Sequence, residues 1–194
     1  MHPVFGFPYI PASAINGILR SWIINEVFDT DGQNSDKKAF TSRLFCDLFG
    51  CEATPDGFYT KENRKGHLIF LDAYPSSGVS IEPDVMTPHY GEYYNTEGVV
   101  PPADYLNPNP ILFLTVVNTS FVFRIGIKEK YNRRLVDYTG DELATASLSA
   151  KLNRRNLTGD DLLNKMALNW LKDALQFSGI GAKTAVGYGR FIKI

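Results

Sequence analysis

A glycine-rich run at residues 179–191, GIGAKTAVGYGRF, constrains the fold of this chain more than any other segment. Glycine permits positive φ angles and leaves the main chain open to close approach by a ligand. The run follows an amphipathic helical pattern and leads into an alternating tail at residues 185–194 that predicts a strand. The run therefore predicts a tight loop between a helix and a strand, and its glycines are Gly179, Gly181, Gly187 and Gly189.

Cationic residues in this run indicate an anionic ligand. Successive main-chain N–H groups in a turn form a concave anion site, and Lys183 and Arg190 add charged donors. These groups predict contact with a phosphate backbone. Two alternatives stay open: Gly179 is typical of a helix C-terminal residue in the left-handed conformation, and the whole loop would also suit tight packing under a sheet.

The spacing within the run argues against an NTPase. A P-loop places glycine directly before its lysine, between a strand and a following helix. Here Ala182 precedes Lys183, a helical pattern comes before the loop, and a strand pattern follows. The run Gly181-Ala182-Lys183-Thr184 is therefore not half of a nucleotide-hydrolysing site.

Length and composition set broad limits. The 194 residues suffice for a buried core, and we expect a single domain over residues 1–194. The chain has no apolar run of about eighteen residues and no leader-like N-terminal pattern, so we expect neither a membrane span nor secretion. Cys46 and Cys51 are too few for a four-ligand zinc site, and we expect both to be reduced and packed near a helix end. Together these features predict a cytoplasmic protein without a cofactor.

Charge is distributed unevenly along the chain. Residues 1–119 carry 7 Lys and Arg against 14 Asp and Glu, whereas residues 120–194 carry 13 against 7. The net charges are thus −7 and +6, although the whole chain is at −1. Such asymmetry indicates an anionic partner for one face. A solvated surface loop is the alternative reading for the basic clusters at 128–134 and 151–155.

Periodicity predicts an α+β fold. Apolar spacing and turn residues predict helices at 13–28, at 36–49 ending at Gly50, and from an N-cap at Thr158, and strands at 67–73, 111–117, 121–127 and 185–194. The strands at 111–117 and 121–127 are expected to form a hairpin around Asn118. Residues 79–109 predict a long central loop insertion, and 128–157 a basic insertion.

The order of these elements fits a ferredoxin-like (RRM-like) βαββαβ unit with insertions. The first strand of that unit is apparently missing from the N-terminus, because a proline-rich segment directly precedes the first helix. We therefore expect either that this strand lies upstream or that another segment takes its place.

The first helix carries a second candidate site. Ser13, Asn16, Gly17 and Arg20 follow the i, i+3, i+4, i+7 spacing of one helix face, opposite the apolar stripe. Free N–H groups and the positive dipole end at a helix N-terminus favour phosphate. We expect this stripe and the glycine-rich loop to form one groove, with a plain solvent-exposed face as the alternative.

Three segments together resemble a known family. They are PYIPASAINGILR at 8–20, DVMTPHYGEYY at 84–94 and GIGAKTAVGYGRF at 179–191. The combination resembles the RAMP superfamily of CRISPR effector proteins. The middle segment, with its Thr-Pro-His-Tyr, is most similar to Cmr-type subunits of type III-B complexes.

The resemblance implies a non-catalytic RNA-binding subunit that holds the 3′ part of the guide RNA. It also implies CRISPR guide RNA, target RNA and other Cmr-type RAMP subunits as partners. The first-helix RNA contacts match Ser13, Asn16 and Arg20, where Asn16 replaces the usual lysine. The central loop, which in such subunits tends to reach the guide–target duplex, matches Asp84, Met86, His89 and Tyr90. The glycine-rich loop matches Lys183, Thr184, Tyr188 and Arg190.

Two other functions stay open. Some RAMP relatives are metal-independent endoribonucleases, and His89 with Tyr90 and Asp84 nearby would suit acid–base chemistry. Asp72 and Asp84 would alternatively suit Mg²⁺, although Asp72 also suits a loop cap. A protein-only scaffold is the third class, in which the acidic half docks neighbouring subunits and the glycines serve packing.

Overall fold

The computed structural model describes residues 1–29, 35–87, 95, 96, 99, 101, 109–129, 138, 140–148 and 159–192. Its residues gather into two compact units. One consists of Met1–Tyr9 and Tyr74–Val122, and the other of Ile10–Ala73 and Phe123–Ile194. We call them the ribbon unit and the helical unit. The expectation of one domain over the whole chain stays a prediction.

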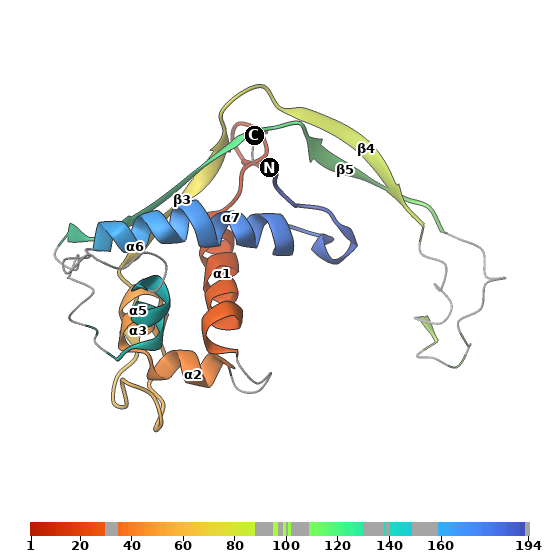
Figure 1. The fold of residues 1–194 in the computed structure, drawn as a ribbon. Helices are drawn as coiled ribbons and strands as arrows, with labels where there is room; N and C mark the ends of the chain where they lie inside the picture. Colours follow the sequence, from red (N-terminus) through yellow and green to blue (C-terminus); the bar gives the residue numbers. More distant parts are fainter. Residues whose placement is uncertain are drawn as a thin grey trace. The chain divides into compact units, whose positions relative to one another are not determined.

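Helices dominate the helical unit (Figure 1). Its helical segments, π- and 3₁₀-turns included, are α1 Ala12–Ile23, η1 Ile24–Phe28, α2 Ser35–Thr41, α3 Arg43–Phe49, α5 Glu142–Leu148, α6 Gly159–Lys165, η4 Met166–Trp170, α7 Leu171–Asp173, η5 Ala174–Ser178 and η6 Thr184–Val186. The predicted first helix is confirmed as α1 continued by η1. Thr158, the predicted N-cap of the last helix, lies outside the described residues.

The core of the helical unit forms where apolar stripes of its helices meet. Ile15, Leu19 and Ile23 recur every fourth residue of α1 and are fully buried, as the helical period requires. The C-terminal helical segment buries Leu162, Met166, Leu171, Ala174 and Leu175. The two stripes belong to elements in contact, because α1 packs on η4, α7 and η5. The apolar side of the C-terminal helical segment thus packs on α1.

The expected helix at 36–49 is two helices, so this prediction is wrong in part. Ser42 separates α2 from α3 with an extended backbone, at φ −77° and ψ 117°. Its Oγ accepts the Phe45 N–H at 3.0 Å and donates to Asp141 at 2.8 Å. A serine N-cap thus starts a new helix, which ends at Gly50 with φ +85° as expected. Cys46 and Cys51 are buried near this end, as predicted, and form no disulfide.

The strands pair differently from the expected hairpin. The strands are β1 Gly50–Cys51, β2 Arg64–Lys65, β3 Leu68–Pro75, β4 Ser80–Met86, β5 Ile111–Val117 and β6 Phe121–Ile127. β3 pairs with β6, β4 pairs with β5, and β1 pairs with β2. The predicted strands at 67–73, 111–117 and 121–127 are therefore confirmed, but β5 and β6 do not pair with each other. Asn118, with φ +46°, redirects the chain between them.

The ribbon unit corrects the central loop prediction. Residues 80–86, expected within a loop, form β4 and pair antiparallel with β5 from Ser80↔Val117 to Met86↔Ile111. Pro83 lacks an N–H, which marks a segment as non-strand unless it lies at an edge. In β4 that proline lies opposite Leu114 in a two-stranded ribbon. Most of the remaining insertion lies outside the described residues.

The tail prediction is also wrong within the described residues. Residues 185–192 contain no strand; a 3₁₀ turn, Thr184–Val186, is followed by further turns. Gly187 and Gly189 adopt φ of +99° and +67°, which an extended strand cannot accommodate. The alternation of apolar residues therefore reflects a looped path.

The fold combines helices with small antiparallel pairs, which confirms the α+β class. Ahead of α1, Ile10 and Ala73 exchange both main-chain hydrogen bonds at 2.9 Å in an isolated antiparallel bridge with β3. The ferredoxin-like order and the missing first strand stay predictions.

Candidate nucleic-acid interface

The glycine-rich loop starts directly at the end of the C-terminal helical segment. Gly179 caps η5 with φ +74°, and the Ile180 N–H donates to the Gly189 carbonyl at 2.8 Å. This bond closes the loop at its base. Between these residues Gly181 and Lys183 also take positive φ angles, +107° and +62°. A backbone with so many left-handed residues needs glycine at most of them, which explains the composition of the run.

The glycines of this loop differ in how much space an added Cβ atom would find around it. A Cβ atom on Gly189 would overlap the Ile180 carbonyl, and one on Gly179 would lie 3.1 Å from the Tyr188 carbonyl oxygen. A Cβ atom on Gly181 or Gly187 would meet nothing within 4 Å, so these two residues face open space. The loop therefore has a closed base, where close main-chain packing requires glycine, and an open tip.

Only part of the loop's main chain remains available to a ligand. The N–H groups of Val186 and Tyr188 donate to the Lys183 carbonyl, at 3.2 and 3.3 Å. Within the described part of the chain, the N–H groups of Gly181 and Ala182 donate no hydrogen bond, and both residues are exposed. Two consecutive amides thus face solvent directly before Lys183, the arrangement that favours an anion. Lys183 is half-buried and Arg190 is exposed.

The predicted stripe on α1 is only partly open to solvent. Ser13 and Gly17 are exposed, whereas Asn16 is half-buried. The Oδ1 atom of Asn16 is buried and has no hydrogen-bond partner among the described residues. Arg20 forms an ion pair with Asp36 at 3.7 Å, and its guanidinium carbon also lies 5.5 and 5.7 Å from the ring centroids of Phe45 and Phe40.

The N-terminus of α1 is already occupied by a carboxylate. Asp72 on β3 accepts the Ala12 N–H at 2.7 Å, while the side chain of the N-cap residue Pro11 has no acceptor atom and makes no cap hydrogen bond. A carboxylate at this position compensates the positive end of the helix dipole. Asp72 was expected as a loop cap, but it lies within β3 and caps the N-terminus of a helix. A phosphate at this end of α1 would have to displace its carboxylate. At the other end of α1, Trp22 stacks on Phe177 at 6.1 Å, close to the start of the loop.

The central-loop residues divide between described and undescribed parts. Asp84 and Met86 lie on β4, opposite Phe113 and Ile111 of β5, and both are half-buried. Asp84 accepts the Val85 N–H at 2.7 Å. His89 and Tyr90 lie outside the described residues. Within the described residues, no three His, Cys, Asp or Glu side chains gather in a way that would hold a metal ion.

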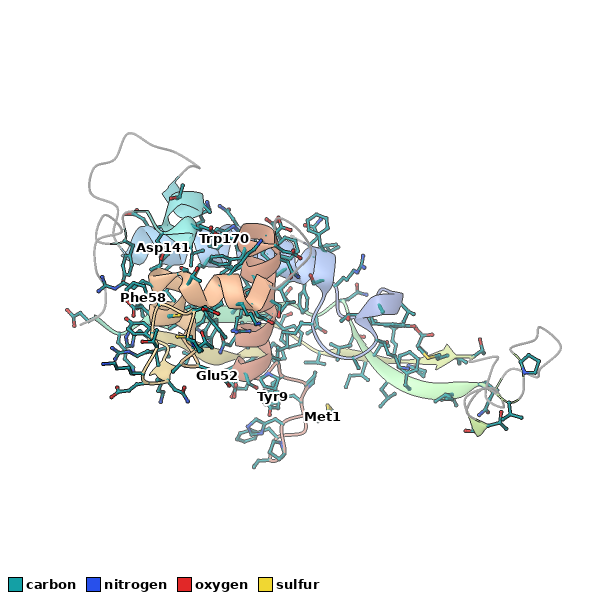
Figure 2. All side chains as sticks on the ribbon, turned by 90° about the horizontal axis from the view of Figure 1, so that it is seen from below. Met1, Tyr9, Glu52, Phe58, Asp141 and Trp170 are labelled. Carbon is teal, nitrogen blue, oxygen red and sulfur yellow. The ribbon has the colours of Figure 1, made fainter. Side chains whose placement is uncertain are left out.

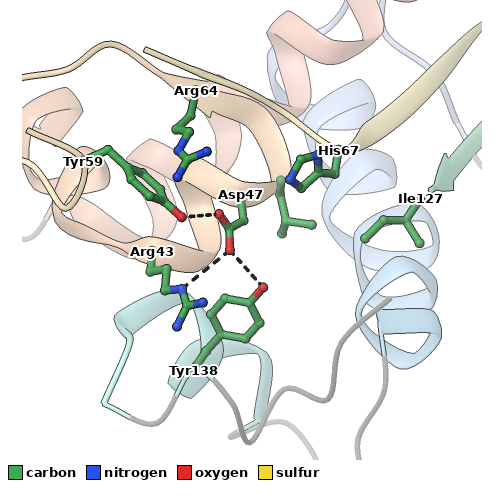
Figure 3. A pocket seen from close by; sticks show the side chains of 8 residues that line it. Arg43, Asp47, Tyr59, Arg64, His67, Ile127 and Tyr138 are labelled. Carbon is green, nitrogen blue, oxygen red and sulfur yellow. Dashed lines mark hydrogen bonds and ion pairs between the residues drawn. The ribbon is translucent and has the colours of Figure 1, made fainter. Parts of the chain in front are cut away.

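A pocket of about 200 Å³ in the helical unit was not predicted from the sequence (Figure 3). Its walls come from α3, β2, β6 and the segments around them, and the lining residues are Arg43, Asp47, Leu48, Tyr59, Arg64, His67, Ile127 and Tyr138. At its centre Asp47 accepts hydrogen bonds from Tyr59 at 2.7 Å and Tyr138 at 3.1 Å. We call it the arginine–tyrosine pocket. No contiguous motif indicates it, since its residues span 43–138 of the chain.

One protein-family model matches nearly the whole chain. The model of the RAMP superfamily matches residues 2–192. The chain belongs to the RAMP superfamily. The match includes residues 8–20, 84–94 and 179–191, the three segments that carried the resemblance in the sequence.

Individual relatives narrow the resemblance within the RAMP superfamily. The chain is 27% identical to "CRISPR system Cmr subunit Cmr6" of Pyrococcus furiosus over 231 aligned positions, covering 97% of this chain and 59% of that protein. It is 30% identical to "CRISPR system CMR subunit Cmr6" of Saccharolobus solfataricus over 131 positions, covering 66% and 36%. The predicted resemblance to Cmr-type subunits is confirmed, and both of these relatives are Cmr6 proteins. The chain spans less than two thirds of the length of each relative.

A solved structure supports the fold of this RAMP chain. This chain is similar to a chain of the "Cryo-EM structure of the Type III-B Cmr-beta bound to cognate target RNA", with a TM-score of 0.55 and 24% identity. The likeness covers 98% of this chain and 46% of that chain, and at this identity it concerns the fold alone.

None of the described helices is long and apolar enough to cross a membrane.

Proposed function

We propose that this RAMP protein is a non-catalytic, cytoplasmic RNA-binding subunit of a type III-B CRISPR (Cmr) effector complex. In this role it holds the 3′ part of the guide RNA and contacts the guide–target duplex during antiviral RNA interference. Its partners are the guide and target RNAs and other Cmr-type subunits. The similarity to Cmr6 proteins supports this assignment. A ferredoxin-like arrangement of the core belongs to the same proposal.

One observation carries the RNA-binding part of the proposal. The tip of the glycine-rich loop offers the solvent-facing N–H groups of Gly181 and Ala182 beside Lys183, with Arg190 exposed in the same loop. Main-chain amides and flexible cations read phosphates and shape, not base edges. A subunit that must accept any guide sequence needs such sequence-independent contacts. Gly179, Gly187, Gly189, Thr184 and Tyr188 hold or line this loop.

The α1 stripe contributes hydrogen bonds more than charge. Asn16 offers a buried oxygen that lacks a donor within the described residues, and Ser13 is exposed one turn before it. A ribose 2′-hydroxyl is a donor that would satisfy this oxygen once the Asn16 side chain turns outward, because the oxygen is out of reach of solvent as it stands. Arg20 is held by Asp36, so its contact with RNA requires that this partly exposed ion pair, worth about 0–1 kcal/mol, be given up.

Contact with other subunits is supported by the ribbon unit. Strands β4 and β5 expose several large apolar side chains to solvent, among them Val85, Leu112 and Leu114. Exposed apolar patches mark protein contact sites. Asp84 and Met86 lie on the same ribbon, and with His89 and Tyr90 they remain our proposed contacts to the guide–target duplex.

Salt-dependent RNA binding tests the proposal. Guide RNA affinity should fall steeply with salt, and Lys183→Ala/Arg190→Ala should lower both the affinity and the salt slope, the latter by about 1.4 for two lost phosphate contacts to a single strand. The matched control Lys37→Ala/Lys172→Ala removes two exposed cations elsewhere and should leave the slope nearly unchanged. An unaltered slope and affinity in the loop variant would contradict RNA binding by this loop.

The nuclease alternative is tested in the same samples. A non-catalytic subunit leaves labelled guide and target RNA intact over the whole incubation. Cleavage that disappears in His89→Ala would instead establish the acid–base mechanism and overturn the non-catalytic assignment.

A further inference from the structure

The arginine–tyrosine pocket is arranged around a carboxylate whose bonds are already made. Asp47 accepts from the hydroxyl groups of Tyr59 and Tyr138 and forms an ion pair with Arg43 Nε at 3.7 Å. Figure 3 shows all three partners converging on this one side chain. An acid so engaged positions its neighbours and has little left to offer a cation.

The two arginines of the pocket lie on aromatic rings. The Arg64 guanidinium carbon is 4.3 Å from the ring centroid of Tyr59, and that of Arg43 is 5.5 Å from Tyr138 and 5.7 Å from Phe58, which Figure 2 labels. Stacking through the face fixes the guanidinium plane and leaves the N–H groups at its edge to bind a partner. Rings and guanidinium groups are thus preorganised before any ligand arrives.

One positive charge remains unbalanced in the pocket. Arg43 offsets Asp47, but Arg64 forms no ion pair with any residue that the structure describes. His67 lines the same pocket, held by its main-chain N–H on the Asp47 carbonyl at 3.0 Å. The pocket therefore favours an anion with several acceptor oxygens, for which a guanidinium fork is well suited.

The size of the pocket limits the ligand. Pockets that enclose a drug-sized molecule measure about 300–1,000 Å³, and this one measures about 200 Å³. It has room for a phosphate group and part of the attached nucleoside. A continuous RNA strand is too large, which separates this pocket from the open glycine-rich loop.

We propose that the arginine–tyrosine pocket binds the terminal phosphate of a nucleotide, with Arg64 and Arg43 as its main ligands and the tyrosine rings as their supports. The phosphate belongs either to a free mononucleotide or to the end of an RNA strand. The proposal does not rest on guide binding by the glycine-rich loop, because a mononucleotide is sufficient to test it.

Calorimetry with the full chain provides the test, with AMP as the probe and adenosine as its phosphate-free control. AMP should bind and adenosine should not. Arg64→Gln should weaken AMP binding about tenfold, the loss expected for charge-assisted hydrogen bonds. Arg64→Lys should recover only part of the lost AMP affinity, because the lysine ammonium is a point charge without the two-pronged geometry of a guanidinium. Lys65→Gln is the matched control: an exposed cation next along β2, outside the pocket, whose loss should change AMP affinity less than about twofold.

The outcomes separate the two phosphate sources and the competing explanations. Tighter binding of a 5′- or 3′-phosphorylated oligonucleotide than of its hydroxyl-ended twin assigns the pocket to RNA ends, and equal binding assigns it to free nucleotides. Arg64→Gln should leave the affinity for a hydroxyl-ended guide RNA unchanged, because this RNA offers the pocket no terminal phosphate, so a failed loop hypothesis does not mimic a failed pocket. Equal binding of AMP and adenosine, or an unchanged AMP affinity in Arg64→Gln, overturns the proposal.

Discussion

The glycine-rich loop and the arginine–tyrosine pocket present positive charge in the helical unit by opposite means. In the loop, residues 179–190 follow one another in the chain, and the backbone itself supplies donors at Gly181 and Ala182. In the pocket, side chains from segments up to 95 positions apart, Arg43 to Tyr138, meet around one carboxylate. The first site depends on φ angles, and the second on rings and hydrogen bonds.

This difference determines which substitutions each site tolerates. The loop should respond to an added Cβ atom, since its base is closed by main-chain contacts at Gly179 and Gly189. The pocket should respond to the loss of a carboxylate or a hydroxyl group, because Asp47 links Tyr59 and Tyr138. Changes at either site should leave the other one working.

The largest effect should come from the loop base. Gly189→Ala forces a Cβ onto the Ile180 carbonyl and strains a residue with φ +67°, and it should lower the free energy of unfolding by about 3–4 kcal/mol. Gly181→Ala, at φ +107° in open space, should cost only about 1–2 kcal/mol, the strain alone. Urea denaturation of both variants measures the gap. Equal losses would show that close packing at Gly189 does not stabilise the loop.

A smaller effect should come from the centre of the pocket. Asp47→Asn replaces hydrogen bonds to a charged acceptor and removes the ion pair with Arg43, and it should cost about 2 kcal/mol of unfolding free energy. Glu52→Gln, an exposed acid just past β1, should change stability by less than about 0.5 kcal/mol. Urea denaturation, read beside guide RNA titrations, should show that Asp47→Asn leaves loop affinity intact. Loss of guide binding would mean that the two sites are coupled.

The smallest effect should appear only in alkali. Burial, with the hydrogen bond to Asp47, raises the pKa of Tyr59 above its ordinary value of 10.0. The folded state therefore holds the proton more tightly, so this contribution is fully present below pH 10 and is lost as pH rises through the folded pKa. Tyr59→Phe should flatten the fall of unfolding free energy with pH above 10 and leave its slope between pH 6 and 8 unchanged.

Cys46 also contributes to the loss of stability in alkali, and its contribution must be separated from that of Tyr59. Burial, and to a lesser degree the neighbouring Cys51 thiol, raises the pKa of Cys46. Stability should therefore begin to fall above pH 9 in both wild type and Tyr59→Phe. An identical pH profile in the two proteins over the whole alkaline range would contradict the bond between Tyr59 and Asp47.

Sequence reasoning succeeded where neighbours along the chain decide the structure. The stripe of α1 could be predicted because Ile15, Leu19 and Ile23 recur at the helical period. The end of the last helical segment at Gly179 could be predicted, because a glycine follows an amphipathic helical pattern there. The glycine-rich loop was recognisable for the same reason, since its residues are contiguous.

Sequence reasoning failed where residues far apart in the chain decide the structure. β4 was missed because Pro83 and its polar neighbours favour a loop, and only pairing with β5 makes the segment a strand. The alternation after Val186 suggested a strand, but positive φ at Gly187 and Gly189 prevents one. The pocket needed Asp47 to meet Tyr138 across 91 positions, a contact that no local pattern encodes.

Photocrosslinking in the assembled complex shows whether the glycine-rich loop touches the guide RNA. Guide RNA carrying 4-thiouridine in its 3′ part would be loaded into a complex containing this chain, irradiated, and the crosslinked peptides identified by mass spectrometry. The account predicts crosslinks on the peptide with residues 179–190, and their loss in Lys183→Ala/Arg190→Ala. Guide crosslinks that spare this peptide while neighbouring subunits are labelled would contradict RNA binding by the glycine-rich loop.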